Sequence, residues 1–137
     1  MPRPLVTAIS VVSVDLPLQR PIVSAVGQYA KWPFIITEIT LDNGTSGNSY
    51  ICPYLVHYTN PIEGVILELF KNFENKPLAP NEFYEIGMRQ LSPLGRSGIG
   101  MYALAALDIA FWDASAKDAD LPLCEHLGGS IADVKAY

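Results

Sequence analysis

The sequence contains few residues of the kinds that build disulfide frameworks or metal centres. Its 137 residues include two cysteines and two histidines, and neither Cys52 nor Cys124 belongs to a C-x-x-C motif. A zinc-type site needs three or four converging Cys, His or carboxylate ligands, and the spacing of Cys52, His57, Cys124 and His126 does not provide them. We therefore expect no metal-binding residues in this chain. Two isolated thiols favour a reducing compartment, the cytoplasm.

Basic residues and long apolar runs are also scarce. Nine Lys and Arg stand against fourteen Asp and Glu, which gives a formal net charge of −5. Such a chain repels phosphate backbones, so we expect no nucleic-acid partner. The longest apolar stretch, residues 99–112, is too short to span a bilayer and contains Asp108. The first residues lack the apolar run of a secretory signal, so no membrane partner is expected.

The first third of the chain predicts an antiparallel sheet. Residues 5–16 are rich in β-branched side chains, and residues 34–41 form a second such run. Residues 42–47 favour a chain reversal, and residues 48–52 return as a short third strand. Between the first two strands, residues 21–33 show no clean period and are predicted to form an unusually apolar loop.

Helical periodicity replaces the strand pattern after Cys52. Asn60 is predicted to cap a helix with apolar residues at i, i+3, i+4 and i+7, and Asn81 is predicted to cap a second helix. Ser97 is the expected cap of a third helix that runs to about Asp118 and is apolar almost all round, so it needs cover on more than one side. The fold class is therefore α+β: a three-stranded antiparallel meander followed by a three-helix layer.

No catalytic constellation stands out within this α+β domain. No Ser/His/Asp or Cys/His set is evident, and the glycines at 95–100 do not form a phosphate-binding fingerprint. Asp108 and Asp113 lie in the apolar third helix, where a buried carboxylate is costly unless it is paired. Asp113 stands four residues before Lys117, the favoured order for a helical ion pair. We interpret both aspartates as structural and expect no catalytic residue.

Residues 103–114 read ALAALDIAFWDA, and they are followed by Lys117, by the tripeptide at 121–123 and by Leu-Gly-Gly at 127–129. This combination resembles the signature of the mandelate racemase/muconate lactonizing enzyme group of the enolase superfamily. Residues in the front half, among them the Ala-Val-Gly at 25–27 and the Pro-Leu-Ala-Pro at 77–80, are most similar to the mandelate racemase branch. The resemblance implies an enolase N-terminal-like capping domain over residues 1–130, with residues 131–137 beginning a (β/α)-barrel domain that is absent from this chain.

Members of the family abstract a proton α to a carboxylate, with Lys or His bases and Mg²⁺ held by the barrel. The resemblance therefore implies a racemase or hydroxy-acid dehydratase as the parent enzyme, a Mg²⁺ site in the missing barrel, and no activity for this chain alone. It also implies a homo-oligomeric parent and a small carboxylate substrate. Racemization and dehydration both stay open.

The capping domain of the family closes two loops over the barrel mouth. Carried over by position, the first loop contains Ile22, Val26 and Tyr29, and the second contains Tyr54. Apolar groups there suit an aromatic or aliphatic 2-hydroxy acid better than a sugar acid. Two alternatives remain: these side chains pack against the sheet, or the chain is a free-standing interaction domain that uses the apolar helix at 99–112.

Overall fold

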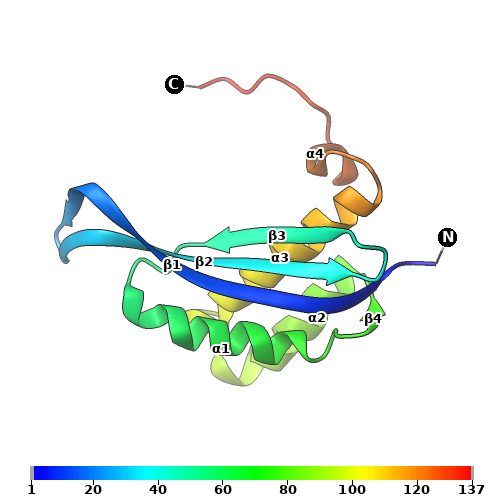
Figure 1. The fold of residues 1–137 in the computed structure, drawn as a ribbon, viewed down its shortest axis with the longest axis horizontal. Helices are drawn as coiled ribbons and strands as arrows, with labels where there is room; N and C mark the ends of the chain where they lie inside the picture. Colours follow the sequence, from blue (N-terminus) through cyan, green and yellow to red (C-terminus); the bar gives the residue numbers. More distant parts are fainter. Residues whose placement is uncertain (1, 137) are drawn as a thin grey trace.

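The computed structural model describes residues 2–136, which form one sheet with helices on one side (Figure 1). The main elements are β1 (Leu5–Ser24), β2 (Gly27–Leu41), β3 (Ser46–Ile51), α1 (Thr59–Phe70), α2 (Pro80–Leu91) and α3 (Ile99–Asp118). Short elements lie between and after them: η1 (Val56–Tyr58), β4 (Lys76–Pro77), η2 (Ser92–Leu94) and α4 (Leu123–His126). The predicted α+β class is confirmed.

The sheet has the strand order β3-β2-β1-β4, and all neighbours are antiparallel. The first three strands form the predicted meander, and β4 adds a two-residue pair beside Leu5 and Val6. Alternate β2 side chains, including Ile35, Thr37 and Ile39, are fully buried, because one sheet face packs against the helices. The side chains between them point to the opposite face, which no helix of the described chain covers (Figure 1).

An aromatic cluster joins the helices to one another. The rings of Phe83 and Phe111 stack with centroids 4.4 Å apart, and Phe73 meets both edge-on at 4.8 and 5.8 Å. Each such pair contributes about 0.5–1.5 kcal/mol beyond the area that it buries. The cluster thus ties the turn after α1 and the faces of α2 and α3 into one core.

Helix α3 lies unusually close to strand β3. A Cβ placed on Gly47 would stand 2.0 Å from the carbonyl oxygen of Ala110 and 2.6 Å from the Cβ of Ala114, so only glycine fits there. Ser49 Oγ donates a hydrogen bond to the Ala106 carbonyl oxygen at 2.6 Å. The small residues of α3 therefore allow this approach, and the hydroxyl of Ser49 fixes it.

Asp113 secures the other end of the same contact. Its Oδ2 accepts a hydrogen bond from the backbone N–H of Asn48 at 2.7 Å and pairs with Lys117 Nζ, also at 2.7 Å. Lys117 in turn donates to the carbonyl oxygen of Ser46. The structural interpretation of Asp113 and the predicted i, i+4 pair with Lys117 thus have a direct basis in the structure.

By length and composition, α3 is long and apolar enough to cross a membrane. Half of its apolar stretch, however, is buried inside the domain. Nine of its residues are buried against the sheet and the other helices. That burial is typical of the core helix of a globular domain. The remaining side of α3 is only partly covered within the described residues, and Ile109 there is 44% exposed.

Several predicted boundaries were wrong. Residues 21–33 are not a loop but part of a long β1–β2 hairpin, because their strands pair with each other beyond the end of β3. The helices begin without side-chain caps: the N-cap residues are Tyr58, Ala79 and Gly98, not Asn60, Asn81 and Ser97.

In the segment that we expect to begin the barrel domain, residues 131–136 form neither strand nor helix. Those residues have no neighbouring strand to supply the hydrogen-bond ladder on which a strand depends. The last residue of that prediction, Tyr137, lies outside the described part of the chain.

Candidate functional site

The β1–β2 hairpin projects from the end of the sheet (the blue and cyan ribbon at the left of Figure 1). β2 pairs with β3 only from Ile35 to Thr40, so residues nearer the turn pair with β1 alone. The pairing is interrupted between Pro17 and Ile22, where four residues of β1 oppose one of β2. Such a bulge bends a two-stranded ribbon and increases its twist.

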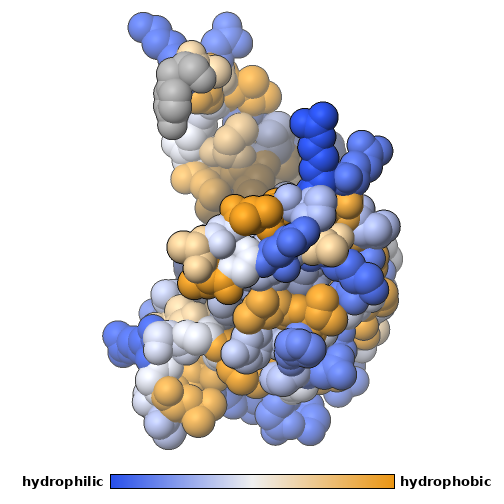
Figure 2. Space-filling model, turned by 90° about the vertical axis from the view of Figure 1, so that its left-hand side faces the viewer, coloured by the Kyte–Doolittle hydropathy of each residue, from blue (hydrophilic) through white to orange (hydrophobic). Residues whose placement is uncertain are grey.

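Apolar side chains are exposed along the tip of this hairpin. Val26 lies in the turn and is 86% exposed, while Ile22, a predicted site residue on β1, is 43% exposed. Val23 between them is also largely exposed. Figure 2, which looks onto the hairpin end of the molecule, shows hydrophobic side chains at the surface among hydrophilic ones. Water-facing valines at the tip of a ribbon contribute nothing to the core of this domain, so they point to a contact outside it.

Tyr54 occupies the segment that follows β3. Its φ is 63°, in the left-handed region that a bulky residue rarely adopts. Its side chain is more than half exposed. Residues held in such conformations often lie at functional sites, where surrounding contacts maintain the strain. The contact in this case is with Trp32 of β2.

Trp32 joins the two predicted loops. Its ring meets Tyr29 edge-on with centroids 6.1 Å apart and meets Tyr54 edge-on at 5.3 Å. The structure therefore brings Tyr29 and Tyr54 to the same tryptophan, although 24 intervening residues separate them in the sequence. Edge-to-face pairs of this kind are directional. The segment carrying Tyr54 is thus positioned against the base of the hairpin.

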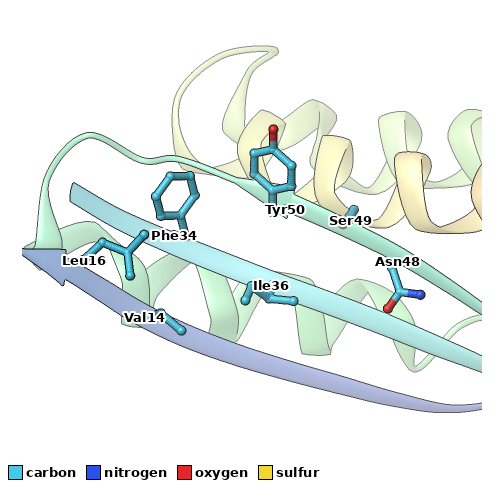
Figure 3. A pocket seen from close by; sticks show the side chains of 7 residues that line it. All are labelled: Val14, Leu16, Phe34, Ile36, Asn48, Ser49 and Tyr50. Atoms are coloured by element: carbon cyan, nitrogen blue, oxygen red, sulfur yellow. The ribbon is translucent and has the colours of Figure 1, made fainter.

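An apolar hollow of about 510 Å³ lies on the uncovered face of the sheet (Figure 3). It is lined by Val14, Leu16, Phe34, Ile36, Asn48, Ser49 and Tyr50. In Figure 3 the rings of Phe34 and Tyr50 stand next to each other, and their centroids are 5.7 Å apart. Because Leu16 pairs directly with Trp32, this apolar surface is continuous with the aromatic contact of the hairpin.

The part of the hairpin between Asp15 and Glu38 carries only positive charges. Between Asp15 and Glu38 the chain carries only two ionisable side chains of formal charge, Arg20 and Lys31. The whole chain has a net charge of −5, so this part of the hairpin is locally opposite in sign to the whole chain. A positive element favours approach by anions.

The described residues do not fit a metal ion. Within residues 2–136 no group of three or more His, Cys, Asp or Glu side chains lies close enough to hold one. His57 lies in η1, and His126 instead bonds Ser115 Oγ through Nε2 at 2.8 Å. Cys52 and Cys124 are free thiols. No step of a reaction can therefore be assigned to a metal on the residues described.

The four predicted site residues fall into one region of the fold. Ile22, Val26 and Tyr29 are on the hairpin, and Tyr54 joins them through Trp32. Sequence reasoning missed Trp32 as the connecting side chain. The signal for it was weak, because nothing in the spacing of residues 29–54 indicates which ring meets which.

Comparisons with known proteins agree with this fold. The family model "Mandelate racemase / muconate lactonizing enzyme, N-terminal domain" matches residues 6–128. The chain is 33% identical over 135 residues to cis-3-hydroxy-L-proline dehydratase of Roseibium aggregatum. This match covers 93% of this chain and 35% of that protein.

Two solved structures are similar over nearly the whole chain. An enolase from the alpha proteobacterium BAL199 with bound magnesium matches with a TM-score of 0.88 and 31% identity. The match covers 93% of this chain and 35% of the enolase. An enolase from Bradyrhizobium complexed with magnesium and mandelic acid has a TM-score of 0.86 at 29% identity, covering 95% and 36%. The chain thus spans about a third of the length of these relatives. On these matches and on its fold, the chain belongs to the N-terminal domain family of the mandelate racemase/muconate lactonizing enzymes, within the enolase superfamily.

Proposed function

We propose that this chain is the lid and substrate-specificity domain of a Mg²⁺-dependent enzyme that removes a proton α to a carboxylate. The observation that carries the proposal is the contact of Trp32 with both Tyr29 and Tyr54. That contact gathers the hairpin and the segment after β3 at one end of the sheet, where exposed apolar groups such as Val26 have no role in the core. A (β/α)-barrel domain is the partner whose mouth this end would close.

The work of this chain would be to exclude water and to select the substrate. A closed apolar lid strengthens the electrostatic interactions in the site beneath it and prevents side reactions. The hairpin is suited to moving, because a two-stranded ribbon is marginally stable by itself and such low-stability elements supply lids. The metal and the proton-transfer groups belong to the barrel in this proposal, and the chain alone is inactive.

The exposed side chains favour an aromatic or aliphatic 2-hydroxy acid as substrate. Ile22 and Val26 offer apolar surface, and the hydroxyl groups of Tyr29 and Tyr54 are the hydrogen-bond donors in the set. A sugar acid would need more polar partners than these. The mandelic acid in the Bradyrhizobium enolase is consistent with this substrate class. Racemase and dehydratase chemistry both fit the proposal.

Arg20 and Lys31 add an electrostatic reason for a carboxylate substrate. They are the only charged side chains between Asp15 and Glu38, and a positive lid raises the local concentration of an anion near the site. We further place the protein in the cytoplasm, assign residues 131–137 to the start of the barrel domain, and expect the parent enzyme to form a homo-oligomer.

The test uses the chain alone and the chain joined to a barrel. With Mg²⁺ and a panel of 2-hydroxy acids, the purified chain should give no turnover. A chimera carries residues 1–129 in place of the corresponding domain of the Roseibium dehydratase, and it should convert cis-3-hydroxy-L-proline. Turnover by the short chain would contradict the proposal. So would a folded chimera whose KM for its substrate stays the same when the tip of the hairpin around Val26 is deleted.

A further inference from the structure

One face of α3 carries a seam of residues at heptad spacing. Met101, Ala105, Asp108, Trp112 and Ser115 follow one another at intervals of four and three residues, which places them on one side of a helix. None of the five is classed among the fully buried core residues. Ile109 stands beside this seam and is 44% exposed. The opposite side of α3 supplies the core of the domain, so the seam is its second, partly uncovered surface.

Asp108 lies at the centre of the seam without a partner in the described residues. Residues 2–136 provide it with neither a hydrogen bond nor an ion pair, whereas Asp113 on the same helix has both. Asp108 is half-buried, and burial raises the pKa of its carboxyl above the ordinary value of 3.8. A carboxylate that loses water without gaining a donor is costly. The arrangement is reasonable if a donor arrives from outside the domain.

The carboxyl-terminal end of the seam shows how the chain uses this face. The His126 ring of α4 contacts Trp112 edge-on at 6.0 Å and bonds Ser115 Oγ. These two seam residues are one and two turns beyond Asp108. After α4, every residue from Leu127 to Ala136 is exposed. The chain therefore leaves the domain from the same face of α3 that carries Asp108.

We propose that the seam Met101–Ala105–Asp108–Trp112, with Ile109 beside it, is the surface on which the following barrel domain docks, and that Asp108 accepts a hydrogen bond or ion pair from a donor of that domain. The occupant is inferred from the exit of the chain beside the seam and from the length of the relatives, about two thirds of which lies outside the part matched by this chain. The donor is an Arg, a Lys or a backbone N–H, because an ionised carboxylate is an acceptor only.

This docking surface rests on the proposed function in one respect: both require a barrel domain. It differs from the lid contact in place and in chemistry, because the hairpin and Tyr54 form a separate apolar surface around Trp32. A domain held along α3 would be anchored rigidly, while the hairpin stays free to open and close.

The first experiment needs only the isolated chain. At pH 7 we expect D108N to raise the free energy of unfolding in urea, because it removes a desolvated charge that has no partner. The matched variant D113N should lower it, since Asp113 loses a charge-assisted hydrogen bond and an ion pair. If D108N destabilises the chain as D113N does, Asp108 has a partner within the domain and the proposal is overturned.

The second experiment measures burial of the seam by thiol labelling. I109C is compared with L67C on α1, because both native side chains are 44% exposed; Cys52 and Cys124 are replaced by Ser in both. In the isolated chain the two thiols should react at similar rates. In the Roseibium chimera, labelling of I109C should slow by at least about tenfold, while that of L67C should not change. Equal labelling of I109C in both proteins would overturn the proposal.

The outcomes separate the two claims. Protection of I109C in a chimera without turnover supports the docking surface and contradicts the proposed function. Turnover by a chimera in which I109C is not protected supports the proposed function and contradicts the docking surface. Protection of I109C in the isolated chain that rises with its concentration would identify a second copy as the occupant and would also overturn the proposal. If the chimera does not fold, the changes in the free energy of unfolding of D108N and D113N in the isolated chain still test the proposal. They are expected to have opposite signs, and a loss of stability in D108N would overturn it.

Discussion

Gly47 makes the close approach of β3 to α3 possible, so Gly47→Ala is the sharpest test of the packing that positions the site. The added Cβ would meet the carbonyl oxygen of Ala110 at 2.0 Å and the Cβ of Ala114 at 2.6 Å. Real Cβ atoms do not come so near to backbone atoms, and no flexible side chain can move aside. Either α3 or β3 must shift, and overpacking of this kind costs about 3 kcal/mol.

The assay is urea unfolding at 25 °C, and Gly64→Ala is the matched control. Gly64 lies within α1, and an added Cβ there would meet nothing within 4 Å. Alanine has the higher helix propensity, so G64A should raise the free energy of unfolding by up to about 1 kcal/mol. G47A should lower it by about 3 kcal/mol with an unchanged slope against urea. If G47A were as stable as the unchanged chain, the packing described for α3 and β3 would be refuted.

Three further predictions concern single side chains. Trp32→Ala removes two edge-to-face contacts and should lower the free energy of unfolding by about 1–3 kcal/mol; no change in urea unfolding would argue against the aromatic contact. Thr37→Val should raise it by about 1 kcal/mol, because Thr37 Oγ1 is buried without a hydrogen-bond partner in the described residues; a loss of stability would reveal a partner. In the Roseibium chimera, the double variant Arg20→Gln/Lys31→Gln should raise KM about threefold at low salt and leave kcat unchanged. The control Lys71→Gln, in the exposed Lys71–Glu68 pair, should alter neither constant. An unchanged KM in the double variant would contradict the electrostatic role of the hairpin.

The meander and the helix layer could be predicted from the sequence because their signals are local and repeated. The alternation of buried and exposed residues in β2 marks the face that packs on the helices, and the period of α1 marks its buried side. These patterns follow from the geometry of strands and helices. The predicted i, i+4 pair of Asp113 and Lys117 is of the same local kind.

The hairpin could not be predicted from the same signals. Pro17, Pro21 and Pro33 suggested a break, since proline lacks the N–H that a ladder needs. In the structure each of them lies where its strand has a neighbour on one side only, because β3 ends at Ile51 opposite Ile35 and β4 pairs only with Leu5 and Val6. Proline is tolerated at such edges. Whether a strand has one neighbour or two is a property of the whole sheet.

The contacts of Trp32 with Tyr29 and Tyr54 could not be predicted from the sequence for a related reason. The contact depends on the register of β1 with β2 and on the left-handed conformation of Tyr54. Neither is encoded in a short motif. The helix caps were predicted wrongly because each helix begins one or two residues away from the start that the predicted cap implies, at Thr59, Pro80 and Ile99.

The central claim is that the hairpin tip and Tyr54 face the substrate, and substrate discrimination by the chimera tests it most directly. The quantity measured is the ratio of kcat/KM for an aryl 2-hydroxy acid to that for cis-3-hydroxy-L-proline. Val26→Ala and Tyr54→Phe should each change this ratio by at least about tenfold without lowering the free energy of unfolding. Leu94→Ala, which alters an apolar residue on η2 that is also largely exposed, should leave this ratio unchanged. A ratio that stays constant in V26A and Y54F, with the chimera folded and active, would contradict the account.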